Sequence, residues 1–294
     1  MTSLSGILLV DKPSGPTSHD VVGRIRKAAD TRRVGHAGTL DPFASGLLLL
    51  LLESSTRLSE YFLGMDKEYE ATVHLGVETA THDLQGEVVS ESPDWGHLSS
   101  QHLEEALEGL RGKILQKPPA YSAKKIQGES AHRRVRRGEE VDLDPVEVEI
   151  KELRVLEVTL PHLRLGVRCS SGTYIRALAR DMGRALKVGG HLSSLRRTAI
   201  GPFSLASASP LDDLRDIQGV QERLLAPAVA LAHFPSIEVG EDEAARIRQG
   251  QFLPVQALGI PEETPLRILM DGELVAVAAR EGGHLKPRKV FAHG

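Results

Sequence analysis

The chain has 294 residues, of which 40% are apolar, and its formal net charge is −4. This length suits one large domain and one small one, at roughly 150 residues per domain. The single cysteine, Cys169, excludes an internal disulfide, and the longest apolar run, residues 47–52, is far shorter than the roughly 20 residues that a membrane-spanning helix needs.

The amino-terminal residues MTSLSGILLVDKPSG carry no basic segment ahead of the apolar ones, so we expect no secretory signal and a cytoplasmic location. The sequence has no Cys/His cluster with metal-ligand spacing and no glycine-rich phosphate-binding motif. We therefore expect neither a metal nor a nucleotide cofactor.

The first expected element is a short strand, residues 7–10, that ends in a Pro/Gly turn. A helix is expected next, because Val21, Val22 and Ile25 begin an apolar stripe of helical spacing. Thr17 and Asp20 ahead of that stripe have the form of a capping box. The six leucines at 47–52 show no polar alternation, which predicts a strand or a helix that is buried on all sides.

Farther along the chain, residues 69–75 alternate in polarity like a half-buried strand, and residues 100–111 have the spacing of an amphipathic helix that Gly112 ends. Segments 146–150 and 163–169 also alternate, one with an acidic and one with a basic outer face, so they could pair in a sheet. A helix is expected from 175 to 186. Separate helices and antiparallel-looking strands indicate an α+β fold. After a Pro/Ala-rich join near 226–236, the tail has short strands and many turns.

The segment RRVGHAGTLDPFASG, residues 32–46, places a single carboxylate, Asp41, among small residues. Asp before Pro is common in turns, so a structural role is the simplest interpretation. The three glycines of the segment would nevertheless let a ligand approach the backbone closely. One carboxylate cannot carry out the two-carboxylate hydrolysis of a glycoside. It can act as a nucleophile or a base while a neighbouring arginine keeps it ionised.

Five motifs occur in order along the chain: GILLVDKPSGPTSHDVV, RVGHAGTLDPFASGLL, KEYEA, PPAYSAKKIQGE and CSSGTYIRALARDMG. Together they resemble the catalytic domain of the bacterial tRNA pseudouridine-55 synthases, the TruB family, over about residues 5–205. The resemblance implies a pseudouridine-synthase fold in residues 1–232, with a mixed, largely antiparallel central sheet flanked by helices. It also implies a basic thumb-like insertion at about 117–145 and a small β-rich PUA-like RNA-binding domain at 233–294.

The activity that the resemblance implies is the isomerisation of uridine 55 in the T-loop of tRNA to pseudouridine, by a monomer and without a cofactor. It maps the catalytic aspartate onto Asp41, which either adds covalently to the sugar or the base or removes the ribose 2′ proton. Tyr69 would stack on the target base and take part in a late proton transfer, and Arg176 would pair with the carboxylate. Without the resemblance, Tyr69 would be an ordinary strand tyrosine and Arg176 a solvated residue in the first turn of a helix.

Five more residues are assigned to substrate binding by the resemblance. His36 would lie near the flipped-out base, Tyr174 would line the pocket, and Leu195 would pack near the uracil. Asp83 would lie at the rim of the pocket, and Lys12 would support the active-site loop. Simpler structural roles are a local hydrogen bond for His36, an Asx turn for Asp83 and a core position for Leu195.

Basic residues fall into two groups that could bind the RNA backbone. The first group lies on the expected amino-terminal helix and the loop after it: Arg24, Lys27, Arg32 and Arg33. The second group lies in the thumb-like insertion: Lys124, Lys125, Arg133, Arg134, Arg136 and Arg137. A charge run is usually a solvated face, and because this one lacks aromatic residues we expect it to contact phosphates rather than stack on bases.

Two other functions fit the same motifs. A tRNA-folding factor would use the basic surfaces without needing Asp41, and this activity could also accompany the isomerase reaction. The guide-dependent catalytic subunit of archaeal and eukaryotic pseudouridylation particles shares the fold, but it normally carries a fuller carboxy-terminal module than this tail.

Overall fold

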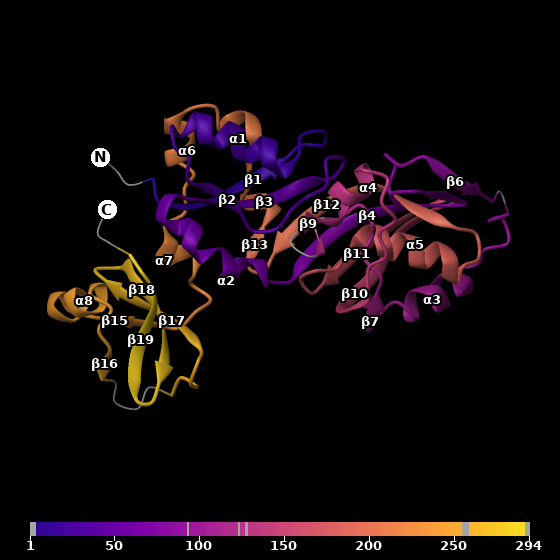
Figure 1. The fold of residues 1–294 in the computed structure, drawn as a ribbon. Coiled ribbons are helices and arrows are strands. Elements are labelled where there is room, and N and C mark those ends of the chain that lie inside the picture. The colour runs from indigo at the N-terminus through magenta and orange to yellow at the C-terminus, as the bar shows by residue number, and fades with distance from the viewer. Residues whose placement is uncertain (1–3, 93, 123, 127–128, 255–258, 292–294) are drawn as a thin grey trace.

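The structure, a computed structural model, describes residues 4–92, 94–122, 124–126, 129–254 and 259–291. These residues form one large sheet and one small sheet, which lies beside one end of the large one (Figure 1). The large sheet has ten strands in the order β14-β1-β3-β12-β4-β11-β10-β7, with β2 beside β3 and β13 beside β12.

The strands of the large sheet are β1 (Gly6–Lys12), β2 (Val34–His36), β3 (Ser45–Leu52), β4 (Lys67–Leu75), β7 (Gly112–Gln116), β10 (Val146–Thr159), β11 (His162–Cys169), β12 (Gly190–Ile200), β13 (Phe203–Ser204) and β14 (Ser209–Pro210). The pairs β1–β14 and β3–β12 are parallel, and the other pairings in this sheet are antiparallel. The expected α+β fold with a mixed, largely antiparallel central sheet is therefore confirmed.

Helices flank the sheets: α1 (Ser18–Ala28), α2 (Ser59–Leu63), α3 (Ser100–Glu108), α4 (Ala131–Arg136), α5 (Ile175–Ala185), α6 (Ile217–Gln221), α7 (Pro227–Ala230) and α8 (Glu241–Arg248). Two hairpins stand apart from the large sheet: β5 (Val77–Thr79) with β6 (Val88–Glu91), and β8 (Lys125–Ile126) with β9 (Glu129–Ser130). In the part of the chain that the structure describes, no helix is long and apolar enough to cross a membrane.

The leucine run is a strand, β3, whose two faces are both covered. Leu47, Leu49 and Leu51 pack with Phe62 and Phe203 in one cluster. The alternate leucines, at 48, 50 and 52, pack in another cluster against the apolar stripe of α1. A strand that is buried on both faces needs no polar alternation, which explains why the pattern by itself fitted either a strand or a helix.

The other expected elements are present, with shifted boundaries; the strand expected at 146–150 extends to Thr159. The capping box of Thr17 and Asp20 begins α1, and β10 pairs with β11 in antiparallel register, Ile150 opposite Cys169. The helix expected at 100–111 ends earlier, at Glu108, because Gly109 caps it. Gly112, with φ +75°, then begins β7 instead of ending the helix.

A third core lies under α3 and α5, which both cover the same face of β4, β11 and β12. It contains Leu107 of α3 and Met182 of α5, together with inward side chains of the three strands such as Leu165. This face carries Leu195 and borders on Tyr69. The helices therefore fix the half of the sheet from which those two side chains project.

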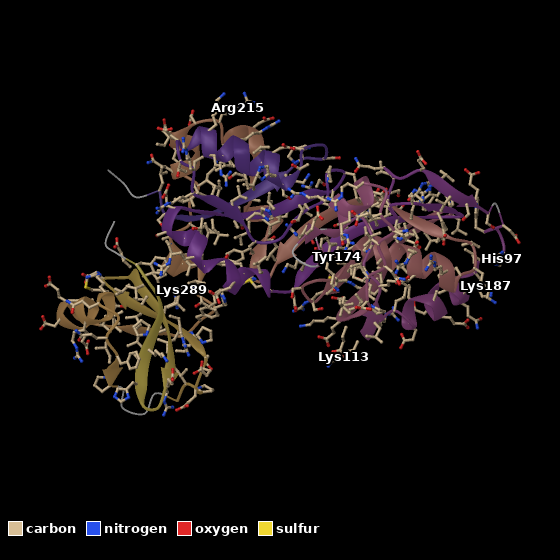
Figure 2. The ribbon with its side chains drawn as sticks, in the orientation of Figure 1. His97, Lys113, Tyr174, Lys187, Arg215 and Lys289 are labelled. Atoms are coloured by element: carbon tan, nitrogen blue, oxygen red, sulfur yellow. The ribbon has the colours of Figure 1, made fainter. Side chains whose placement is uncertain are left out.

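The small sheet contains β15 (Ser236–Glu238), β16 (Leu253–Pro254), β17 (Pro265–Met270), β18 (Glu273–Glu281) and β19 (His284–Val290), in the order β15-β17-β18-β19-β16. It joins the large sheet through apolar and charged contacts. Phe291 shares a cluster with Phe62 of α2. The Lys289 ammonium, labelled at this junction in Figure 2, lies 2.8 Å from the carboxylate of Glu60.

Gly46 is required where β3 meets β12. Its φ is +101°, and a Cβ at this position would lie 2.7 Å from the backbone nitrogen of Arg197. We expect Gly46→Ala to lower the free energy of unfolding by about 3 kcal/mol or more, because backbone strain and overpacking act together. The measurement is urea unfolding followed by circular dichroism.

The matched control is Gly112→Ala, at a glycine with φ +75° and no atom within 4 Å of the added Cβ. It isolates the cost of the backbone conformation, about 1–2 kcal/mol. Equal losses for both variants would contradict the close approach of β12 to Gly46.

Candidate active site

Asp41 lies in the loop between β2 and β3, and its side chain is 34% exposed. The start of the loop continues the hairpin, since the amide of Ala37 donates to Leu49 O at 2.9 Å. Its end is a turn in which the amide of Ala44 donates to Asp41 O at 3.1 Å. The carboxylate is thus presented by a short loop that is anchored to a fully buried strand.

Arg176 makes a two-point ion pair with this carboxylate. Its Nε lies 2.9 Å from Asp41 Oδ2, and its Nη2 donates to Asp41 Oδ1 at 3.3 Å. The arginine is only 5% exposed, so it is not a solvated residue of a helix face. The guanidinium also donates to the carbonyls of Thr81, at 3.0 Å, and Tyr121, at 2.9 Å. A planar guanidinium held at this many points has a fixed orientation.

Asp83 is the second acid at this guanidinium. Its Oδ2 lies 3.3 Å from Nη1 of Arg176, and its Oδ1 accepts from the amide of Gln85 and the hydroxyl of Thr81. Asp83 therefore has both an Asx-turn role and an ion pair with Arg176. Asp83 is 4% exposed, which places it behind Arg176 and corrects the expected position at the rim of a pocket.

Burial and charge oppose each other at Asp41. Desolvation raises the pKa of its carboxyl above the ordinary aspartate value, and the negative charge of Asp83 raises it further. The cations of Arg176 and Lys12 lower the same pKa, but they do not outweigh burial. Arg176 therefore moderates the pKa of Asp41 rather than holding it at a low value.

Lys12 supports the loop from beneath. It is fully buried, and its ammonium donates to the carbonyls of Pro13, Pro16 and Pro42 at 2.9, 2.7 and 3.3 Å. Burial lowers its pKa to about 8. Because Pro42 follows Asp41 directly, Lys12 acts on the loop, and in this structure its buried ammonium has no surface to offer a substrate. The three carbonyl contacts hold the loop from its buried side.

Ser18 at the start of α1 reinforces this support. Its hydroxyl donates to Leu40 O at 3.0 Å and accepts from Leu40 N at 2.8 Å. The residue that precedes Asp41 is thereby tied to a helix whose other contacts are apolar.

The apolar side of the site comes from the central sheet. Leu195 is buried in the cluster under α3 and α5, together with Leu40 and Phe43 of the loop, and Tyr69 packs against this cluster. Burial raises the pKa of the Tyr69 phenol, while the charge of Arg197 lowers it. Asp41, Tyr69 and Leu195 are thus brought to one region although they are far apart in the sequence.

Tyr174 and His36 lie at the ends of elements that border the loop. Tyr174, near the middle of the large sheet in Figure 2, is the residue before α5, and it is half-buried. His36 is the last residue of β2 and is also half-buried. Desolvation lowers the pKa of its imidazole, which favours the neutral ring.

Two positioning contacts were not foreseen from the sequence. Gln116, fully buried at the end of β7, accepts from Tyr174 N at 2.8 Å and donates to Tyr174 O at 3.1 Å. Arg197, 1% exposed, donates to Leu47 O at 2.7 Å and to Gly38 O at 3.1 Å. The sequence signal for Arg197 is that it lies two residues after Leu195 and therefore on the same face of β12. Nothing in the local sequence distinguishes Gln116.

The basic residues of α1 and the loop after it are all exposed: Arg24, Lys27, Arg32 and Arg33. Among the described residues, none of these four forms an ion pair with a carboxylate. They constitute a free positive surface, which we call the α1 surface.

The basic residues of the insertion differ from those of the α1 surface, because two of them form ion pairs with acids. Arg137 contacts Glu129 at 2.5 Å and Glu139 at 2.7 Å, and Arg134 also contacts Glu139, at 2.7 Å. Lys124 is half-buried and Arg133 is exposed, while the side chains of Lys125 and Arg136 lie outside the described residues. In this structure two of the expected phosphate-binding arginines are therefore occupied by acids.

The chain is similar to known proteins in both sequence and fold. Residues 26–175 match a family model described as the TruB family pseudouridylate synthase (N terminal domain), and residues 176–231 match one described as the tRNA pseudouridylate synthase B C-terminal domain. The chain is 46% identical to tRNA pseudouridine synthase B of Arthrobacter sp. (strain FB24), over 98% of this chain and 97% of that protein. It is 42% identical to the protein of the same name from Corynebacterium glutamicum (strain R), over 95% and 94%.

Solved structures with a similar fold include an H/ACA RNP bound to a substrate RNA containing 2′-deoxyuridine, with a TM-score of 0.75 and 26% identity over 99% of this chain and 86% of that one. A second is a Cbf5-Nop10-Gar1 complex, with a TM-score of 0.75 and 28% identity over 98% and 85%. The resemblance drawn from the five motifs is thus confirmed by both sequence and fold.

We expect the carboxyl of Asp41 to titrate above the ordinary aspartate value, because burial disfavours its charged form. Arg176→Met should raise this pKa further by removing the nearest cation. The measurement is the carbon-13 shift of the carboxyl against pH. Asp20 serves as the internal reference, because hydrogen bonds from Thr17 lower its pKa. An Asp41 that titrates below Asp20 would contradict the balance described above.

Proposed function

The chain belongs to the TruB family of pseudouridylate synthases and is an enzyme of tRNA pseudouridylation, and from that premise we propose that it isomerises uridine 55 of the T-loop with Asp41 as the catalytic carboxylate. The observation that supports this proposal is the two-point ion pair between Asp41 and the buried Arg176. It fixes one partly exposed carboxylate beside Tyr69 and Leu195.

The reaction conserves all atoms of the substrate. The bond between N1 of the uracil and C1′ of the ribose breaks, the base turns, and a bond forms between C5 and C1′. The proton lost from C5 is balanced by one gained at N1. No water is consumed, so no second carboxylate is needed to activate one, in contrast to a glycosidase. Asp83 would not serve for that purpose, because it is buried behind Arg176.

Asp41 must be ionised to act as either nucleophile or base. Because burial raises its pKa, the carboxylate form is lost as the pH falls through a value above that of an ordinary aspartate. The charge of Arg176 opposes this rise in pKa. Covalent addition and removal of the 2′ proton both use the same ionised oxygen. A transcript with deuterium at C2′ distinguishes them, since only proton removal is slowed by the heavier isotope.

The side chains around Asp41 suit a flipped-out uracil. Tyr69 offers a ring for stacking and a hydroxyl for the late proton transfer, and Leu195 offers an apolar surface beside it. Tyr174 lines the pocket, and His36 lies near the base. Extraction of the base from the T-loop costs stacking energy, which such contacts offset.

The RNA backbone would be bound by the α1 surface and by the insertion at 117–145. We assign residues 1–232 to the catalytic domain and residues 233–294 to a PUA-like domain that adds RNA contacts. The family relationship supports tRNA as the partner of a monomeric enzyme. The close relatives are synthases of tRNA at 42–46% identity, whereas the solved RNP subunits are 26–28% identical, which favours free tRNA over a guide-dependent substrate.

We expect Asp41→Asn to lower pseudouridine formation at position 55 by at least about a thousandfold, with tRNA affinity changed less than about threefold. The measurement is pseudouridine mapping on an unmodified tRNA transcript together with a filter-binding isotherm. Asp30→Asn is the matched control, since Asp30 is exposed and its φ of +47° is one that asparagine tolerates.

Normal turnover by Asp41→Asn would remove Asp41 from the catalytic role. Pseudouridine formation on a transcript with cytidine at position 55 would refute the choice of target. Restoration of tRNA folding by the inactive Asp41→Asn protein, in a strain lacking the synthase, would establish the accompanying folding activity.

We expect tRNA affinity to fall steeply with salt, and Arg32→Ala with Arg33→Ala to make that fall shallower. Each lost phosphate contact should reduce the slope of log affinity against log salt by about 0.7–0.9. Lys187→Gln is the control, because Figure 2 labels Lys187 at the end of the molecule that is remote from α1. An unchanged slope in the double variant would show that the α1 surface does not contact phosphates.

A further inference from the structure

Arg197 is the largest fully buried side chain among the described residues, with 1% of its surface exposed. None of the described carboxylates lies within ion-pair distance of it. Its guanidinium donates instead to three backbone carbonyls, those of Leu47 at 2.7 Å, Gly38 at 3.1 Å and Thr39 at 3.4 Å. A buried cation that no anion neutralises is costly to retain, so its position needs an explanation.

The three acceptors bracket the loop that carries Asp41. Gly38 and Thr39 precede the aspartate, and Leu47 follows the loop in β3. These contacts are possible because β12 pairs with β3 and places Arg197 opposite Gly46. Gly46 has no side chain, which permits the two strands to lie this close together. One side chain thus fixes both ends of the loop.

The same residue reaches the other catalytic element. On its second side, β12 pairs with β4, and Arg197 lies opposite Tyr69. The charge of Arg197 lowers the pKa of the Tyr69 phenol against the effect of burial. The other charged or titratable groups that act on Tyr69 are Cys169 from β11 and Asp41 from the loop, and both raise this pKa.

Two further buried cations lie near Arg197, and unlike an arginine they can lose their charge. Lys12 and Lys67 each have a pKa lowered to about 8, mainly by burial and in part by Arg197. Either lysine can relieve the repulsion by releasing a proton. An arginine remains charged at any ordinary pH, so Arg197 is the cation of this group whose charge is fixed.

We propose that Arg197 is a positioning residue for the isomerisation: a single buried guanidinium aligns the Asp41 loop with Tyr69 and supplies a permanent positive charge next to the phenol. This inference rests on the proposed roles of Asp41 and Tyr69. It goes beyond them because it assigns to one residue the relative placement of the carboxylate and the base-stacking ring.

The test compares Arg197→Met, which removes the charge and the donors, with Arg197→Lys. The lysine keeps part of the donor set, and it keeps the charge at an assay pH below the pKa of about 8 that the neighbouring buried Lys12 and Lys67 have. Arg267→Met is the matched control. Arg267 also donates to backbone carbonyls, Phe234 O at 3.0 Å and Ala228 O at 2.8 Å, but it does so from β17 to the segment that leads into the small sheet. For each folded protein, the single-turnover rate on a tRNA transcript, the tRNA dissociation constant and the thermal midpoint are measured.

We expect Arg197→Met to lower the single-turnover rate by about a hundredfold, because small misplacements of reacting groups have effects of that size. The tRNA dissociation constant should change less than about threefold, and Arg197→Lys should recover at least about tenfold of the lost rate. Arg267→Met should leave the rate per folded molecule unchanged. Equal losses of rate and affinity in Arg197→Met, or a normal rate, would overturn the proposal.

A second readout does not depend on activity. With ring-labelled tyrosine, and Tyr69→Phe to assign the signal, the Tyr69 phenol should titrate at higher pH in Arg197→Met than in the wild type. Arg197→Lys should show an upward shift as well, because a buried lysine has already lost its proton at the pH where a phenol titrates. An unshifted phenol would overturn the contact with Tyr69. If Arg197→Met does not fold, Arg197→Lys decides: an unshifted Tyr69 titration in that variant would overturn the proposal. A wild-type enzyme that is inactive on uridine 55 would refute the proposed function and leave this titration test intact.

Discussion

The buried guanidinium of Arg176 is the contact on which the site depends. It joins the loop after β2, the turn around Thr81 and Asp83, the segment at Tyr121 and the first turn of α5. A cation is unfavourable at a helix amino terminus, and α5 has no acid of its own in its first turn. Asp41 and Asp83 supply the missing negative charge through space, so the helix and the loop stabilise each other.

Burial gives this arrangement its chemical character. The carboxylate of Asp41 is partly desolvated, which raises its pKa, and two cations oppose that shift. Lys12 reaches the loop only through carbonyl oxygens, and Arg197 does the same from the sheet side. Charged donors therefore hold the backbone around Asp41. The carboxylate of Asp41 forms its ion pair with Arg176. A site of this kind suits a reaction that stays within one substrate molecule and needs no activated water.

The two surfaces that we assign to RNA binding differ in their ion pairs. The α1 surface has no carboxylate partners among the described residues, whereas Arg134 and Arg137 of the insertion are paired with Glu129 and Glu139. Exposed ion pairs of this kind contribute little stability, so a phosphate can replace the acid at small cost.

The sequence alone determined the features that depend on residues close to one another in the chain. Alternation predicted β4, β10 and β11, the capping box predicted the start of α1, and five ordered motifs identified the family. It could not decide whether the leucine run was a strand or a helix, because complete burial removes the periodicity that tells them apart. The tertiary structure decided that, and it also decided the positions of Asp83, Gln116 and Arg197. Their roles arise from contacts between segments far apart in the chain, and a buried charge becomes recognisable only when its surroundings are known.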